Sequence, residues 1–172
     1  MSVWKKLVGS VVFVAMVGVA FAFAVIWFQS GSAPPSESAK ANWQVDCRGP
    51  QGSLNCVATQ SLYGKTTGRR LLSAGVRVAP ETKQPVLLLR LPLGVYLPGG
   101  ILLRIGDQPE KRLAVETCTE NGCAAKTAVT KDEIAALLRG ANLVVSVRDE
   151  KRKTVTFQIL GGGFDKAYTR LN

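Results

Sequence analysis

QPVLLLRLPLGVYLPGGILLRIGD, residues 84–107, is the most distinctive segment of the chain. Its first part, residues 84–91, has an unbroken apolar centre, which predicts a strand that is buried on both faces. The second part is apolar enough to suggest a membrane span. Two prolines, several glycines and the flanking Arg90 and Arg104 argue against a span, because backbone groups in lipid must all be hydrogen-bonded. We therefore predict a strand, a Pro-Gly-Gly turn and a second strand over residues 91–107.

Short segments of alternating polarity, separated by turn residues, lie on both sides of this stretch. A turn at residues 48–52 separates two of them and predicts a hairpin, and residues 117–123 predict a tight loop containing Asn121 and Gly122. Further strands are predicted at residues 42–47, 54–62, 70–78, 112–116, 143–147 and 154–160. Many short strands at close intervals indicate a mostly β protein, an antiparallel β-sandwich or barrel-like domain.

One or two short helices are predicted near the C-terminal end. Thr130 and Glu133 have the spacing of a capping box, and Gly140 is a suitable stop for the helix that follows them. After three consecutive glycines, Phe164 and Tyr168 fall on one face of a second, short helix.

An uncharged segment of 22 residues, residues 7–28, lies near the N-terminus. As a helix it would be roughly 33 Å long, enough to cross the ~30 Å hydrocarbon core of a bilayer. Two lysines precede it, so the positive-inside rule places the N-terminus in the cytoplasm and the rest of the chain outside. We predict a single transmembrane helix, a retained signal anchor in the inner membrane. Its interfacial and helix-packing residues are Trp4, Lys5, Lys6, Gly9, Gly18 and Trp27.

A cleaved signal peptide is the alternative, with cleavage after Ala22, Ala24 or Ala33. Residues 29–42 begin with a stretch rich in Ser, Pro and Ala, which is typical of a linker. The predicted organisation is a cytoplasmic N-terminus (1–6), a transmembrane helix (7–28), a linker (29–42) and a periplasmic domain (43–172). Cleavage would leave the same domain in the periplasm or secreted.

Composition limits the chemistry that the chain can perform. Its 172 residues carry a net charge of +10 and include no histidine. This absence excludes Ser-His-Asp and Cys-His nucleophile systems, HExxH zinc hydrolases and every His general base. Four carboxylates crowd one stretch without indicating a catalytic pair: Asp107, Glu110, Glu116 and Glu120. We predict no enzymatic activity, no metal and no cofactor, with a periplasmic enzyme of unknown type as an alternative.

Four cysteines in an exported domain favour disulfides. The spacing suggests two local bridges, one between Cys47 and Cys56 and one between Cys118 and Cys123, while other pairings stay open. A zinc site or a redox-active pair would favour C-x-x-C spacing, which the sequence lacks. We therefore expect the bridges to fix loops.

The excess of positive charge suggests a binding surface. Residues 43–172 carry 19 basic and 11 acidic side chains. We expect no nucleic-acid partner, because aromatic residues do not interleave with the basic runs and the domain lies outside the cytoplasm. A protein partner or anionic lipid headgroups fit better, against the competing interpretation of a core hairpin and a solvated turn. The candidate partner surface consists of Tyr96, Leu97, Arg148, Lys151, Arg152 and Lys153.

Four elements occur in a characteristic order along the chain. They are Trp43-x3-Cys47 followed by Cys56, then Leu91-Pro92-Leu93-Gly94-Val95 with Leu97-Pro98-Gly99-Gly100, then Cys118-x4-Cys123, then Gly163-Phe164 with Ala167. Together they resemble the invasion-associated locus B family of alphaproteobacteria, over residues 43–171. The resemblance implies an exported, disulfide-containing, β-rich domain, in a family named because some members promote host-cell invasion. It supplies no catalytic residues, and the membrane span departs from the cleaved, secreted pattern of the family.

These observations predict a non-enzymatic, membrane-anchored periplasmic domain that binds a protein partner, as an accessory subunit of an inner-membrane complex. A secreted or surface factor that promotes host-cell invasion is the alternative that the resemblance implies. The identity of the partner and the oligomeric state stay open.

Overall fold

The computed structural model describes residues 42–50 and 55–171. All of them belong to one compact unit, Pro35–Asn172. The predicted cytoplasmic segment, the membrane anchor and nearly all of the linker lie outside the described residues, so the predictions made for them stay predictions. Within the described part of the chain, no helix is long and apolar enough to cross a membrane.

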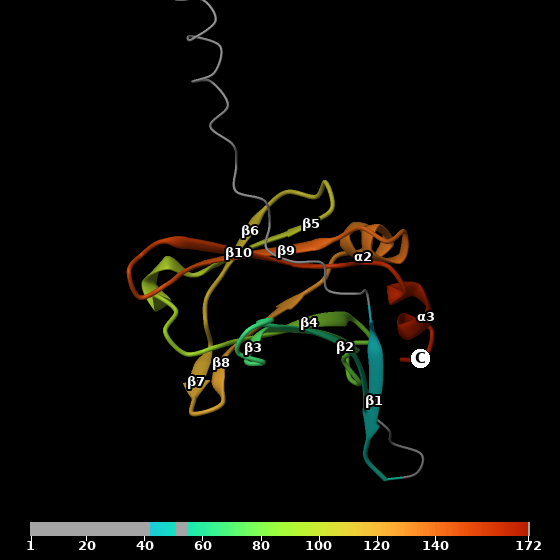
Figure 1. Cartoon of the computed structure of the whole chain (residues 1–172). Helices are drawn as coiled ribbons and strands as arrows, with labels where there is room; N and C mark the ends of the chain where they lie inside the picture. Colours follow the sequence, from blue (N-terminus) through green and yellow to red (C-terminus); the bar gives the residue numbers. More distant parts are fainter. Residues whose placement is uncertain (1–41, 51–54, 172) are drawn as a thin grey trace, which may run out of the picture. The chain divides into compact units, whose positions relative to one another are not determined.

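The domain is built from short antiparallel strands with two short helices, as the turn spacing predicts. In chain order its elements are β1 (Gln44–Arg48), β2 (Asn55–Tyr63), β3 (Arg70–Val78), β4 (Pro85–Leu91), a 3-10 turn η1 (Leu97–Gly99), β5 (Ile101–Ile105), β6 (Lys111–Leu113), β7 (Thr117–Thr119), β8 (Gly122–Ala128), α2 (Lys131–Leu138), β9 (Leu143–Arg148), β10 (Thr154–Ile159) and α3 (Phe164–Tyr168). The strands form a six-stranded sheet of order β1-β2-β3-β4-β8-β7 and a four-stranded sheet of order β10-β9-β5-β6. Figure 1 shows the two sheets as two layers of a sandwich-like fold.

The core lies between the two sheets. Because side chains alternate across a strand, each sheet contributes every second residue to it. The fully buried large side chains are Leu72, Val76, Leu87, Leu89, Leu91, Ile101, Leu103, Ile105, Leu137, Leu143, Ile159 and Phe164. In β4, Leu87 and Leu89 face this core, whereas Val86 and Leu88 are only half-buried on the other face of the sheet. The expectation that this strand is buried on both faces is therefore wrong.

The two helices close one end of the sandwich (Figure 1). At the start of α2 the predicted capping box is present: the Thr130 side chain accepts from the Glu133 backbone N–H, and the Glu133 carboxylate accepts from that of Thr130. The same carboxylate pairs with Lys111 at 2.8 Å, so this buried glutamate is fully engaged. In α3, Phe164 packs its ring edge-on against Trp43, with centroids 4.9 Å apart.

Two segments differ from the prediction. Residues 117–123 form a hairpin rather than a loop, and this hairpin leads into β8, a strand that the sequence pattern does not predict. Residues 92–96 lie outside the strands, apart from an isolated bridge between Val95 and Asp149. The strand predicted to begin at residue 91 is therefore absent, and Leu91 is instead the last residue of β4.

Candidate functional site

The loop before β5 and the turn between β9 and β10 meet at one end of the domain (Figure 1). The Tyr96 backbone N–H donates to the Arg148 carbonyl at 2.8 Å. A Cβ placed on Gly99 would lie 3.3 Å from Tyr96 Cδ1 and 3.5 Å from Arg148 Cδ, so these two side chains flank the glycine. The structure thus joins two segments that the sequence nominates separately as a partner surface.

The β9–β10 turn has a defined shape. Asp149 Oδ1 accepts from the Lys153 backbone N–H at 2.8 Å, and the Arg152 backbone N–H donates to the Asp149 carbonyl at 2.9 Å. The left-handed backbone of Arg152, with φ +62°, lets the chain reverse direction. Its guanidinium lies 5.2 Å from the centre of the Tyr96 ring, which is cation–π geometry. The turn and the loop are therefore linked by side chains as well as by backbone.

The resulting surface combines positive charge with exposed apolar area. Leu97 is 49% exposed at the tip of the loop. Arg112 of β6 donates to the Gly99 carbonyl and adds a cation beside the loop. We call this surface the Tyr96 patch; it comprises Tyr96, Leu97, Arg112, Arg148, Lys151, Arg152 and Lys153. All six residues of the predicted partner surface belong to it, and Arg112 is the member that the sequence analysis does not assign to this surface.

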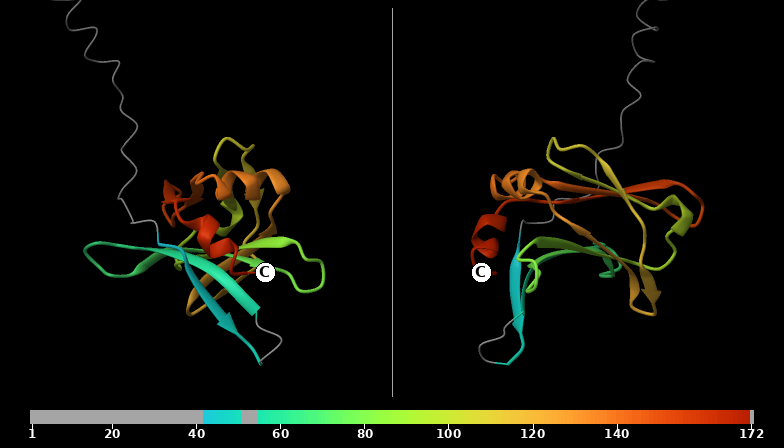
Figure 2. Two further views of the ribbon diagram at one scale, coloured as in Figure 1. Left: turned by 90° about the vertical axis from the view of Figure 1, so that its right-hand side faces the viewer. Right: turned by 180° about the vertical axis from the view of Figure 1, so that it is seen from behind.

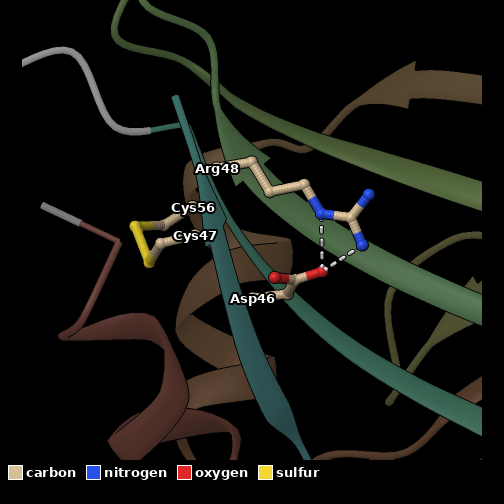
Figure 3. The surroundings of a disulfide bond; sticks show 4 residues. All are labelled: Asp46, Cys47, Arg48 and Cys56. Atoms are coloured by element: carbon tan, nitrogen blue, oxygen red, sulfur yellow. Dashed lines mark hydrogen bonds and ion pairs between the residues drawn. A yellow bond between two sulfur atoms is a disulfide. The ribbon is translucent and has the colours of Figure 1, made fainter. Parts of the chain in front are cut away.

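Both predicted disulfides are present, and all four cysteines are paired. Cys47 of β1 lies directly opposite Cys56 of β2 in the strand register, and Cys118 of β7 lies opposite Cys123 of β8. Since β1 and β7 are the two outermost strands of the six-stranded sheet, each bridge joins an edge strand to its neighbour. Figure 3 shows the first bridge on one face of β1, with Asp46 and Arg48 on the opposite face.

The four clustered carboxylates are all exposed. Glu116 forms an ion pair with Lys126 at 3.4 Å, and its neighbours in sequence do not converge on it. Within residues 42–50 and 55–171, no group of three or more Cys, Asp or Glu side chains is arranged as metal ligands.

The structure defines a class of protein. It is an antiparallel β-domain of two sheets, and in the larger sheet a disulfide joins each outermost strand to its neighbour. The family model described as Invasion associated locus B (IalB) protein matches residues 43–172, and the chain belongs to this family.

Relatives and a solved structure agree with this assignment. The invasion protein B homologs of Brucella abortus strain 2308 and of Brucella abortus biovar 1 strain 9-941 are each 29% identical over 163 residues, covering 90% of this chain and 94% of the relative. The crystal structure of invasion associated protein B from Bartonella henselae matches with a TM-score of 0.66, over 78% of this chain and 92% of that chain, at 18% identity. The last comparison shows that the fold is shared.

Proposed function

We propose that the chain is a non-enzymatic periplasmic protein, anchored in the inner membrane, whose β-domain docks on an acidic protein partner as an accessory subunit of a membrane complex. The Tyr96 patch is the observation that carries this proposal. It presents exposed Leu97 and the Tyr96 ring beside five cations, the pattern of an interface with an apolar centre and a charged rim. The turn also carries two acidic residues: the Asp149 carboxylate accepts from the Lys153 backbone N–H, and Glu150 is exposed, so the cations of the patch outnumber the acids.

Native sizing tests this proposal on the full chain, extracted from its own membranes with mild detergent. We expect the wild-type chain to migrate in a species well above its own 18.4 kDa mass, together with a second polypeptide. The double variant Leu97→Asp, Lys151→Glu should migrate without that polypeptide. Leu138→Asp is the matched control, since Leu138 is another exposed leucine, on α2. A wild-type chain that migrates alone contradicts the proposal.

The relatives favour a second function, that of a secreted or surface factor acting in host-cell invasion. The Brucella proteins carry the name invasion protein B homolog, and they align along nearly their whole length with this chain. N-terminal sequencing of the mature protein separates the two functions. A start at the N-terminal methionine region supports the anchored protein, whereas a start near Val25 or beyond Ala33 supports secretion.

A further inference from the structure

The outward face of the six-stranded sheet, which faces away from the core, is hollowed. A depression of about 460 Å³ is lined by residues from β1, β2, β3, β4 and β8. Figure 2 shows the β1–β2 and β7–β8 hairpins extending away from the four-stranded sheet on the two sides of this face. We call the depression the sheet groove; it is separate from the Tyr96 patch, with which it shares no residue.

The floor of the sheet groove is kept low by small side chains. Gly75 lies in the middle of β3, where a glycine weakens a strand and often marks a close approach of another backbone. A Cβ at this position would lie 3.1 Å from Val57 Cγ1 and 3.3 Å from Thr59 Cγ2, so these two side chains already occupy the space above Gly75, which is buried. Leu88 is paired with Gly75 in the register and is half-buried beside it. The centre of the floor is therefore formed by the half-buried side chains of Val57, Thr59 and Leu88.

Cations surround this apolar centre. Arg90 lies next to Ser73 and Ala124 in the strand register, so its guanidinium is flanked by small side chains. Among the described residues, Arg90 has no hydrogen bond and no ion pair. Arg70 also lines the groove, and donates to the Asn121 carbonyl at 3.4 Å.

Two acidic side chains beside the groove are already occupied. Asp46 accepts two bonds from Arg48, at 3.1 and 2.8 Å, as Figure 3 shows, and Glu116 pairs with Lys126. Arg90 and Arg70 thus lack carboxylate partners on their own sheet. An arginine presents a planar fork of donors that matches a carboxylate, and such pairs are stronger than neutral hydrogen bonds.

We propose that the sheet groove binds an extended polypeptide segment in which acidic side chains alternate with apolar ones. Its carboxylates pair with Arg90 and Arg70, and an apolar side chain lies against Val57 and Leu88. The arginines without carboxylate partners require an anionic ligand. The apolar floor favours an acidic peptide over a polysulfated glycan. A polysulfated glycan would leave Val57 and Leu88 uncovered, and the residues that line the groove include no aromatic ring on which a sugar could stack.

Fluorescence anisotropy on the full chain in mild detergent tests the proposal, with a labelled ten-residue peptide of alternating Glu and Leu as the probe. We expect Arg90→Glu to weaken binding by about tenfold or more, because it removes one charged pair and opposes another carboxylate. Gly75→Val should weaken binding by a similar factor without changing the charge, since its side chain displaces Val57 and Thr59 and so changes the shape of the floor. Lys166→Glu, an exposed cation on α3, is the matched control and should change the dissociation constant less than twofold.

Three outcomes overturn the proposal. An equal loss with Lys166→Glu would mean that net charge alone attracts the peptide, and tighter binding of heparin that ignores Gly75→Val would point to a polyanion. A loss with Arg152→Glu but not with Arg90→Glu would move the peptide to the Tyr96 patch, which leaves the docking function intact. Circular dichroism of Gly75→Val checks folding, and if that variant unfolds, Gly75→Ala replaces it with a smaller expected loss.

Discussion

The two disulfide hairpins occupy equivalent places at opposite edges of the six-stranded sheet, yet they are held differently. In the β1–β2 hairpin, Cys47 is exposed and Cys56 half-buried, on strands that reach beyond the core (Figure 2). In the β7–β8 hairpin, Cys123 is 2% exposed and is part of the apolar core. At one edge of the sheet the disulfide therefore fixes a projecting hairpin. At the other edge it joins the edge strand to a residue of the apolar core.

The sharpest difference lies at Gly122, where β8 begins. Its φ is +114°, and a Cβ there would overlap the Leu91 carbonyl oxygen, so the second hairpin is pressed against β4. Gly122→Ala should lower the free energy of unfolding by at least about 3 kcal/mol, because strain and overlap add. Gly68→Ala is the control: this glycine also has a positive φ, +60°, but open space around it, and should cost about 1 kcal/mol. Urea unfolding measures both, and similar costs would contradict the close packing of the second hairpin.

Removing the second bridge should have the next largest effect. Closing a short loop by a disulfide stabilises by about 2 kcal/mol through the unfolded chain. Cys123 adds packing, so Cys118→Ala with Cys123→Ala should cost about 3 kcal/mol in non-reducing urea unfolding. Reduction of the Cys47→Ala, Cys56→Ala variant, in which Cys118–Cys123 is the remaining bridge, provides an independent measure of the same bridge.

Removing the first bridge should cost slightly less, about 2.5 kcal/mol. The loop between Cys47 and Cys56 is longer, with a sequence separation of 9 against 5, and its closure entropy is therefore slightly greater. Its sulfur atoms lie outside the core, so Cys47→Ala with Cys56→Ala loses little packing. If this double variant were the less stable of the two, loop length rather than burial would govern the contribution of each bridge.

The size of the core-facing side chains decides which strands can be predicted from the sequence. The strands with large apolar residues and clear turns, such as β3 and β9, are predicted almost to the residue. β8 is not, because its core-facing positions are small: Cys123 and Ala125 lie opposite Leu91 and Leu89 of β4, which supply the volume. A strand whose partner fills the core carries no hydrophobic pattern of its own.

The sequence predicts the candidate site in two separate pieces for a related reason. Both pieces of the Tyr96 patch are recognisable as an exposed loop and a charged turn, but their contact depends on strand pairing. β5 pairs antiparallel with β9, which brings the residues before β5 next to those after β9. The sequence does not predict the sheet groove, because the apolar run around Leu88 suggests burial on both faces, while one face of β4 is only half-buried.

The projecting hairpin must be fixed at its base as well as by its bridge, and Trp43 provides that contact. Its indole Nε1–H donates to the Leu160 carbonyl at 2.9 Å, immediately before β1 begins. Trp43→Phe keeps an aromatic ring beside Phe164 and loses this bond, so it should lower the free energy of unfolding by about 1 kcal/mol. Tyr168→Phe is the matched control. Among the described residues its hydroxyl has no hydrogen bond, while its ring also packs on Phe164, and the change should be close to neutral. Equal costs would mean that the rings alone hold the base of the hairpin, and that β1 depends on its disulfide more than the structure indicates.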